Sequence, residues 1–99
     1  MFAFEQELQF EWDKGNSSKN FIKHKVSNEE AEQIFFSQPI IDLDQKHYGQ
    51  ELRLSAIGQT EKQRILFITF TIRGKNVRVI SARDANEKER GRYVENQKI

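Results

Sequence analysis

The residues best suited to chemistry lie toward the C-terminus, in the stretch "VISARDANEKERGRY" at positions 79–93. The stretch begins as an apolar strand, ends as a charged helix and brings Ser81, Arg83, Arg90 and Tyr93 toward one corner of the fold. Arginine suits phosphate because its planar guanidinium donates to two phosphate oxygens at once. The stretch therefore indicates a phosphate-binding site, with a strand edge and a solvated helix as the simpler alternative.

A second arginine is expected beside Arg83. Two apolar runs flank the dipeptide Gly74-Lys75, and glycine at the first position of a two-residue loop is typical of a type II′ hairpin. Counting pairs outward from this loop places Leu66 opposite Arg83 on the core face. Arg64 then lies on that face too, next to Arg83, where the core ends. A register slip of one residue would exchange the two faces.

The chain has two histidines, His24 and His47, and imidazole is the side chain that titrates nearest to neutral pH. Either could act as a general acid or base, although a lone histidine is more often a surface or hydrogen-bonding residue. Glu51 lies two residues before Arg53, so the two share one face of a strand. An ion pair with Arg53 is the favoured interpretation of Glu51, and acceptance of a proton is the alternative.

The elements that must position these residues follow from hydrophobic spacing and capping signals. Ser27 with Glu30, and Asn86 with Glu89, form two capping boxes, so a helix begins at each. The other predicted elements are a strand at 8–13, a helix at about 16–25, and strands at 51–60, 64–73 and 76–83. Together they predict one α/β (α+β) domain over residues 1–99, with an antiparallel sheet, two N-terminal helices and a C-terminal helix.

Composition excludes several classes of site. The chain of 99 residues is 36% hydrophobic and 31% charged, as in folded domains, and it has no cysteine and no His/acid spacing typical of a metal site. It lacks an apolar run near the ~20 residues of a membrane span and a signal-peptide pattern, so we expect a cytoplasmic protein. Residues 1–51 hold 5 Lys/Arg and 10 Asp/Glu, whereas residues 52–99 hold 11 and 5. This asymmetry favours an anionic partner for the second half, unless the charges interleave in space.

Short motifs recur in a definite order along the chain. They are "FEWD" at 10–13, Asn20, "KH" at 23–24, "VS" at 26–27, "EEA" at 29–31, His47, Glu51, Arg53, "IG" at 57–58, Arg64, Thr71, Arg73, "ISAR" at 80–83, Ala85, and "ER" with Tyr93. This ordered set resembles the BrnT family, the toxins of a type II toxin–antitoxin system. Each motif alone is weak, but the set spans nearly the whole chain.

The resemblance implies a small RelE-like domain and a metal-independent endoribonuclease without a cofactor. RNA would be cut by attack of the ribose 2′-OH on its own phosphate. The resemblance also implies a BrnA-like antitoxin that neutralises the toxin and supplies DNA binding, so that DNA is contacted only indirectly and no membrane is involved. The alternative hypothesis is a non-catalytic RNA- or protein-binding module on the same scaffold.

Residue types and resemblance together give the candidate site residues. The predicted catalytic residues are His24, His47, Glu51, Arg64 and Arg83. The predicted RNA-binding residues are Lys19, Lys23, Arg53, Arg73, Arg78, Arg90 and Tyr93. The alternative for Tyr93 is packing of the last helix. The alternative for Arg64 and Arg83 is an ion pair with Glu61, Asp84 or Glu87.

Three positions depart from the family pattern. Asn16 stands where the family usually has Lys, which removes a candidate phosphate contact. Lys25 stands where a helix-ending Gly is usual, so the first helix is expected to end differently and to shift His24. Asn28 stands where Phe is usual, which removes an apolar packing residue.

Overall fold

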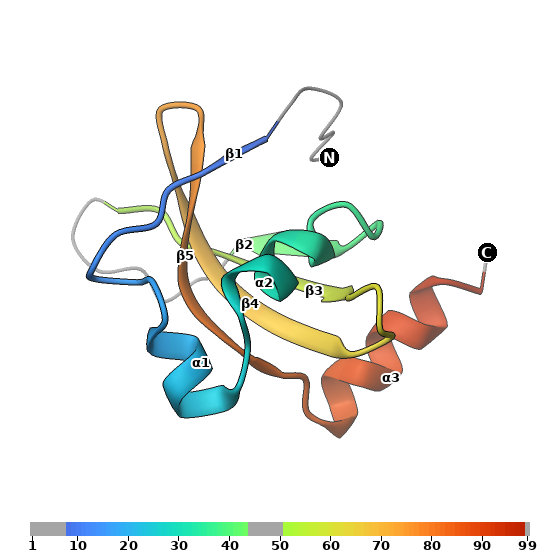
Figure 1. Cartoon of the computed structure of the whole chain (residues 1–99). Helices are drawn as coiled ribbons and strands as arrows, with labels where there is room; N and C mark the ends of the chain where they lie inside the picture. Colours follow the sequence, from blue (N-terminus) through green and yellow to red (C-terminus); the bar gives the residue numbers. More distant parts are fainter. Residues whose placement is uncertain (1–7, 44–50, 99) are drawn as a thin grey trace.

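The computed structural model describes residues 8–43 and 51–98, and it shows one five-stranded sheet with three helices (Figure 1). The strands are β1 (Gln9–Phe10), β2 (Ile40–Leu43), β3 (Leu54–Gln59), β4 (Ile65–Arg73) and β5 (Asn76–Asp84), in the spatial order β1-β5-β4-β3-β2. The helices are α1 (Lys19–His24), α2 (Asn28–Ile34) and α3 (Glu87–Asn96). The α+β class is confirmed.

The sheet is mixed rather than antiparallel, because β1 runs parallel to β5. The predicted strand at 8–13 is only two residues long, since the chain turns away after Glu11, whose backbone N–H still donates to the Val77 carbonyl. Leu8, Phe10 and Trp12 nevertheless pack against the core, as their spacing predicts.

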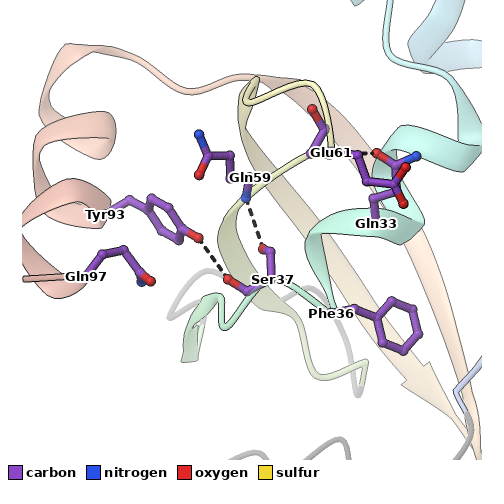
Figure 2. A pocket seen from close by; sticks show the side chains of 8 residues that line it. Gln33, Phe36, Ser37, Gln59, Glu61, Tyr93 and Gln97 are labelled. Atoms are coloured by element: carbon purple, nitrogen blue, oxygen red, sulfur yellow. Dashed lines mark hydrogen bonds between the residues drawn. The ribbon is translucent and has the colours of Figure 1, made fainter. Parts of the chain in front are cut away.

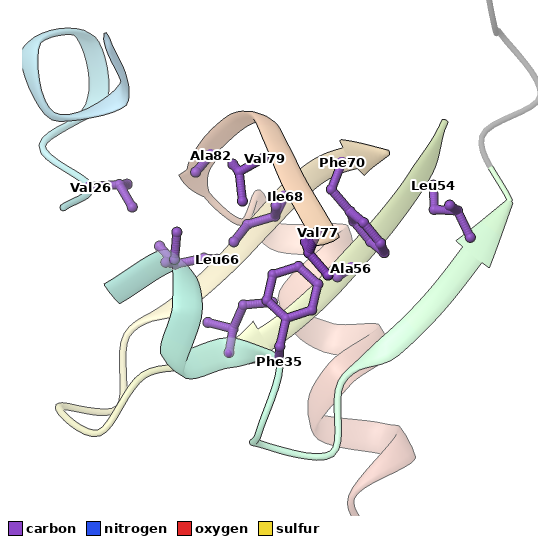
Figure 3. Packing of buried hydrophobic residues seen from close by; sticks show 12 residues of the cluster. Val26, Phe35, Leu54, Ala56, Leu66, Ile68, Phe70, Val77, Val79 and Ala82 are labelled. Atoms are coloured by element: carbon purple, nitrogen blue, oxygen red, sulfur yellow. The ribbon is translucent and has the colours of Figure 1, made fainter. Parts of the chain in front are cut away.

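The core lies between the sheet and α2, which packs on β3 and β4, whereas α1 lies against β5. Phe35, just after α2, is the largest contributor, and its ring meets that of Phe70 edge-on with centroids 5.0 Å apart. Figure 3 shows Phe35 facing Leu66, Ile68 and Phe70, with α3 on the far side of the strands. Residues 64–73 are apolar on both faces, which predicts a strand inside the sheet, and β4 is its central strand.

The β4–β5 hairpin begins as predicted and then changes register. Gly74 has φ +62 in the two-residue loop, and the pairing follows the expected count as far as Phe70 opposite Val79. A β-bulge follows, with Ile80 as the extra residue, so Leu66 faces Asp84 and not Arg83. Strict alternation would bury the hydroxyl of Ser81, whereas the bulge brings Ala82, 0% exposed, into the core instead.

Both predicted capping boxes are present. At the start of α2 the Glu30 N–H donates to the Ser27 hydroxyl over 3.1 Å, and the Ser27 N–H donates to the Glu30 carboxylate over 3.0 Å. At the start of α3, Asn86 and Glu89 exchange the same two bonds over 2.8 and 2.9 Å. These caps fix Glu30 and Glu89, which both reappear at the candidate site.

The first helix is shorter than predicted, and two buried asparagines flank its start. Asn16 is 2% exposed, and its amide donates to the carbonyls of Glu11 and Val79 over 2.9 and 3.0 Å. Asn20 is 5% exposed and accepts from the Ala82 N–H over 2.9 Å. Asn16 therefore joins a loop to the outer edge of β5 and does not face a surface that phosphate could reach.

The end of α1 corrects the expectation for Lys25. This residue adopts φ +59, the left-handed conformation that glycine supplies at helix ends, so the helix ends there in spite of the substitution. A β-carbon is disfavoured in this conformation. His24, the last residue of α1, is thus presented by an ordinary left-handed helix end.

We expect Lys25→Gly to raise the free energy of unfolding by about 1 kcal/mol, because glycine adopts this conformation without steric cost. Lys25→Ala removes the same charge and keeps the β-carbon, so it should change stability little. Urea denaturation of the two variants measures the difference. Equal effects of the two substitutions would contradict strain at this position.

Candidate active site

Arg64, which follows the β3–β4 turn, is the most extensively bonded side chain at one end of the sheet. Its Nε donates to Asp84 Oδ1 over 2.6 Å, and its Nη2 donates to Asp84 Oδ2 over 3.2 Å. Its Nη1 lies 3.3 Å from both Glu30 carboxylate oxygens and donates to the Lys25 carbonyl over 2.7 Å. Nη2 also donates to the His24 carbonyl over 3.0 Å. Arg64 therefore ties the end of β5 to the end of α1 and the start of α2.

The cluster concentrates charge around Asp84. The hydrogen bond from Arg64 is the main reason that the pKa of Asp84 lies below its ordinary value, and nearby Arg90 and the protonated form of His24 lower it further. His24 is half-buried at the end of α1. The structure thus brings the predicted His24, Arg64 and Arg90 to one end of the sheet.

A pocket of about 360 Å³ lies at this cluster. Its lining is formed by Gln63, Arg64, Ile65, Asp84, Ala85 and Arg90. Arg90 is exposed and forms no ion pair with any residue of the described ranges, whereas Arg64 has its donors occupied. Arg90 is therefore the arginine of this pocket that an incoming anion can reach without displacing a carboxylate.

Arg83 does not lie beside Arg64 on the core face, so that prediction is wrong. The bulge pairs Arg83 with Phe67 on the opposite face, and its guanidinium stacks on the Phe67 ring at 4.4 Å from the centroid. Two nitrogens of Arg83 donate to the two carboxylate oxygens of Glu89 over 2.8 and 3.0 Å. The ion-pair alternative is confirmed for Arg64, which binds Asp84, whereas Arg83 is also paired but with Glu89, an acid that the alternative did not include.

A second group of predicted residues lies toward the end of β4 that is distant from Arg64. It consists of Glu51, Arg53, Arg73 and Arg78. Arg73 ends this strand, and its nine residues span about 27 Å at ~3.4 Å per residue. Arg73 bridges Glu11 and Glu51 at 3.3 and 3.4 Å, and Arg53 lies 3.6 Å from Glu51, which confirms the expected Glu51–Arg53 pair. Arg78, whose side chain is 13% exposed, binds Asp13 and Glu11.

The remaining candidates take separate positions. Tyr93 is 4% exposed and donates to the Ser37 carbonyl over 2.8 Å, so it packs the last helix, as its alternative proposed. Lys23 is exposed on α1, and Lys19 reaches the Ile80 carbonyl at 3.4 Å. His47 lies outside the described residues. The pair His24 and Arg64 and the pair Glu51 and Arg73 lie at opposite ends of β4, so they are too far apart to belong to one active site.

The family can now be identified by sequence comparison. A family model described as the ribonuclease toxin BrnT of a type II toxin–antitoxin system matches residues 12–89. The chain belongs to the BrnT family. A search of the curated proteins found no match.

The region matched by the BrnT model includes Arg64, Arg83 and the arginines near the far end of β4, and it ends at Glu89, the partner of Arg83. Arg90 and most of α3 lie beyond it. No helix in the described part of the chain is long and apolar enough to cross a membrane. Within residues 8–43 and 51–98, no three His, Asp or Glu side chains gather as a metal ion would require.

Sequence reasoning missed the second role of the capping carboxylates. Glu30 and Glu89 each close a capping box and each bind an arginine of the BrnT motifs, Arg64 and Arg83 respectively. The capping signal was visible, but the contact across 34 residues to Arg64 depends on the packing of α2 against β4. A glutamate at the third position of a helix and an arginine next to a strand, with no acidic neighbour of its own in the sequence, are the signals that could have suggested this contact.

These ion pairs predict an acid-sensitive fold. For Glu89, burial raises the pKa and is the largest single influence, but the hydrogen bonds from Arg83 and from the Asn86 N–H, together with the charge of Arg83, outweigh it, so the pKa is lowered, as it is for Asp84. A lowered pKa in the folded state contributes stability above the unfolded-state value of about 4, and that stability is lost as pH falls through the folded-state value. We expect the free energy of unfolding to be level above about pH 5 and to decrease below about pH 4.

Urea denaturation between pH 3 and 7 measures this dependence. Glu89→Gln should flatten part of the acidic slope, whereas Glu87→Gln, at an exposed carboxylate on the same helical turn, should leave it unchanged. An identical slope for the wild type and Glu89→Gln would contradict the contribution of the Arg83 pair.

Proposed function

We propose that this BrnT-family chain is a metal-independent endoribonuclease with its active site at the His24–Arg64–Asp84 cluster. The observation that carries the proposal is a pocket lined by a bound arginine, Arg64, and an accessible arginine, Arg90, with the half-buried His24 at the adjacent end of α1. The family description supports RNA cleavage, and the residue types at the cluster support proton transfer and charge stabilisation as its means.

In the proposed reaction, neutral His24 removes the proton of a ribose 2′-OH. The 2′ oxygen forms a bond to the adjacent phosphorus, and the bond from phosphorus to the 5′ oxygen of the next nucleotide breaks. The leaving oxygen takes a proton from solvent water, which leaves a 2′,3′-cyclic phosphate and a 5′-OH. Arg90 stabilises the charge that develops on the phosphate, since a cation placed at the reacting oxygens lowers the energy of the transition state.

Arg64 acts in this proposal as a positioning residue. Two carboxylates and two backbone carbonyls occupy its guanidinium, so an RNA phosphate could bind it only by displacing Asp84 or Glu30. Its bond to the His24 carbonyl fixes the end of α1 relative to the pocket. Arg83 can reach phosphate only by exchange with Glu89, and its side chain is 38% exposed.

The cellular context belongs to the same proposal. We propose that the chain acts in the cytoplasm on a RelE-like scaffold and is neutralised by a BrnA-like antitoxin that supplies the DNA contacts of the pair. Membership of a type II toxin family supports a protein antitoxin. Phe21 and Ile22 on α1 are 51% and 75% exposed, and this apolar surface next to His24 suits contact with such a protein.

The second candidate function is a binding module without catalysis. One observation favours it: the predicted catalytic arginines Arg64 and Arg83 are already paired with carboxylates in the structure. Such a module would bind RNA or the antitoxin through Lys23, Arg90 and the exposed face of α1.

Incubation of the purified chain with labelled RNA in EDTA tests the two functions. We expect cleavage that leaves 2′,3′-cyclic ends and that stops at any position where a 2′-deoxynucleotide replaces the ribonucleotide. Cleavage at a 2′-deoxy position would exclude the proposed nucleophile, and loss of cleavage in EDTA would exclude metal independence. Binding without cleavage, with or without added divalent metal, would support the module.

A further inference from the structure

A second and larger pocket lies on the other side of the β3–β4 turn, between α2 and α3. Its volume is about 560 Å³. Figure 2 shows Tyr93 and Gln97 entering from α3 on one side, Gln33 and Phe36 from α2 and its end on the other, and Ser37 and Gln59 between them. Glu61, on the turn, completes the lining next to Gln33.

The lining offers both hydrogen-bond donors and acceptors. The Glu61 N–H donates to Gln33 Oε1 over 3.1 Å, which fixes the Gln33 amide and leaves its Nε2 hydrogens without a partner among the described residues. Gln59 Nε2 donates to the Gln63 carbonyl over 3.2 Å, which leaves its Oε1 as an acceptor. The Glu61 carboxylate forms no ion pair with any residue in the described part of the chain and is exposed at the pocket.

An aromatic side chain lines the same pocket. Phe36 is 63% exposed, whereas its neighbour Phe35 is 1% exposed and belongs to the core. An exposed phenyl ring at a concave polar site is suited to stacking against a flat ligand. The combination of fixed amides, one carboxylate and an exposed ring matches the chemistry by which proteins bind unstacked nucleobases.

We propose that this pocket binds a guanine base of the RNA substrate. Guanine presents two adjacent donors, N1–H and the N2 amino group, and the Glu61 carboxylate can accept from both. The Gln33 Nε2 hydrogens can donate to the O6 acceptor, and Phe36 can stack on the ring. The other three bases lack two adjacent donors, so they cannot form the paired bond to the carboxylate.

The location connects this pocket with the proposed active site, and the inference rests on the proposed function in taking RNA as the ligand. The β3–β4 turn separates the two pockets, and its Thr60 is bonded to Arg64 in both directions, over 2.8 and 3.1 Å. Helix α3 lines both, with Arg90 in one and Tyr93 and Gln97 in the other. Seven helical residues cover about 10 Å, so a strand with a phosphate at Arg90 can place a nearby base in the second pocket.

Titration of the isotopically labelled chain with each of the four nucleoside 5′-monophosphates, followed by NMR, tests the assignment without requiring cleavage. We expect 5′-GMP to shift the side-chain amide signals of Gln33 and Gln59, and to bind about tenfold more tightly than AMP, CMP or UMP. Glu61→Gln should remove this preference, on the order of tenfold, because an amide cannot accept two hydrogen bonds in the same way. Phe36→Ala should weaken all four nucleotides.

The matched control is Glu29→Gln, at an exposed carboxylate of α2 that does not line the pocket; it should leave GMP binding unchanged. Equal binding of the four nucleotides, or shifts confined to residues around Arg90, would overturn the assignment. If the Gln33 and Gln59 amide signals shifted only on addition of a protein antitoxin and not with any nucleotide, the assignment would also be overturned. The pocket would then be a protein contact. GMP binding without RNA cleavage would uphold the base pocket and count against the proposed nuclease, whereas cleavage without guanine preference would do the reverse.

Discussion

Replacing His24 with alanine is expected to lower the rate of RNA cleavage by about 10²- to 10⁴-fold, the usual contribution of a general acid–base residue. The fold should survive, because no side-chain hydrogen bond of His24 holds α1 in place within the described residues and alanine is a good helix former. Single-turnover cleavage assays measure the rate.

Ile22→Ala provides a control on the same helix, at a side chain that is 75% exposed. It should cleave RNA at the wild-type rate. A fully active His24→Ala protein would eliminate His24 as the proton acceptor and direct attention to the other candidates. An inactive Ile22→Ala protein would show that the whole surface of α1, rather than the imidazole, is what RNA requires.

Among the charged side chains of the candidate site, Arg64 should contribute most to the free energy of unfolding. Arg64→Ala leaves Glu30 and Asp84 without their partner, and hydrogen bonds to charged groups contribute about 1.5–3 kcal/mol. The Arg64 side chain is 25% exposed, so solvent screens the loss only in part. We expect the free energy of unfolding to fall by about 2–3 kcal/mol and Tm by roughly 10–20 °C.

Arg90→Ala is the matched control, because this arginine lines the same pocket without an ion pair in the described ranges. Its stability should stay within about 0.5 kcal/mol of the wild type, while its cleavage rate falls. Arg64→Lys should recover little, since one ammonium cannot bridge acceptors on three elements. Wild-type stability of Arg64→Ala would show that the cluster does not hold α1, α2 and β5 together.

Much of the fold follows from local signals. The Ser27–Glu30 and Asn86–Glu89 boxes predict the starts of α2 and α3, and Gly74 predicts the hairpin, because each signal involves residues within a few positions of one another. Residues 64–73 are apolar on both faces, which likewise predicts a central strand, and β4 is central.

The arrangement of the candidate site could not be obtained in this way. Its predicted geometry assumed an unbroken register, and one bulged residue moved Arg83 to the other face from Arg64. A warning was present, since the unbroken register would have put the polar Ser81 in the core. The partners of Arg64 come from α1, α2 and β5, and that convergence depends on tertiary packing that no local pattern specifies.

The departures from the family pattern also acquire a physical meaning. Lys25 ends α1 in the conformation that glycine would adopt, and Asn28 donates to the Ser17 hydroxyl over 3.2 Å, between the loop before α1 and the start of α2. Asn16 is a buried bonding residue. Structural adaptation accounts for Asn16 and Asn28, so neither substitution by itself argues for loss of activity.

The two buried asparagines have a consequence for how molecules of this protein meet one another. Beyond the short pairing with β1, the outer edge of β5 would present the Val79 carbonyl and the Ala82 N–H to any passing strand. Asn16 and Asn20 bind these two groups instead, so the edge cannot template the addition of another chain. These two amides therefore guard the chain against edge-to-edge aggregation along β5.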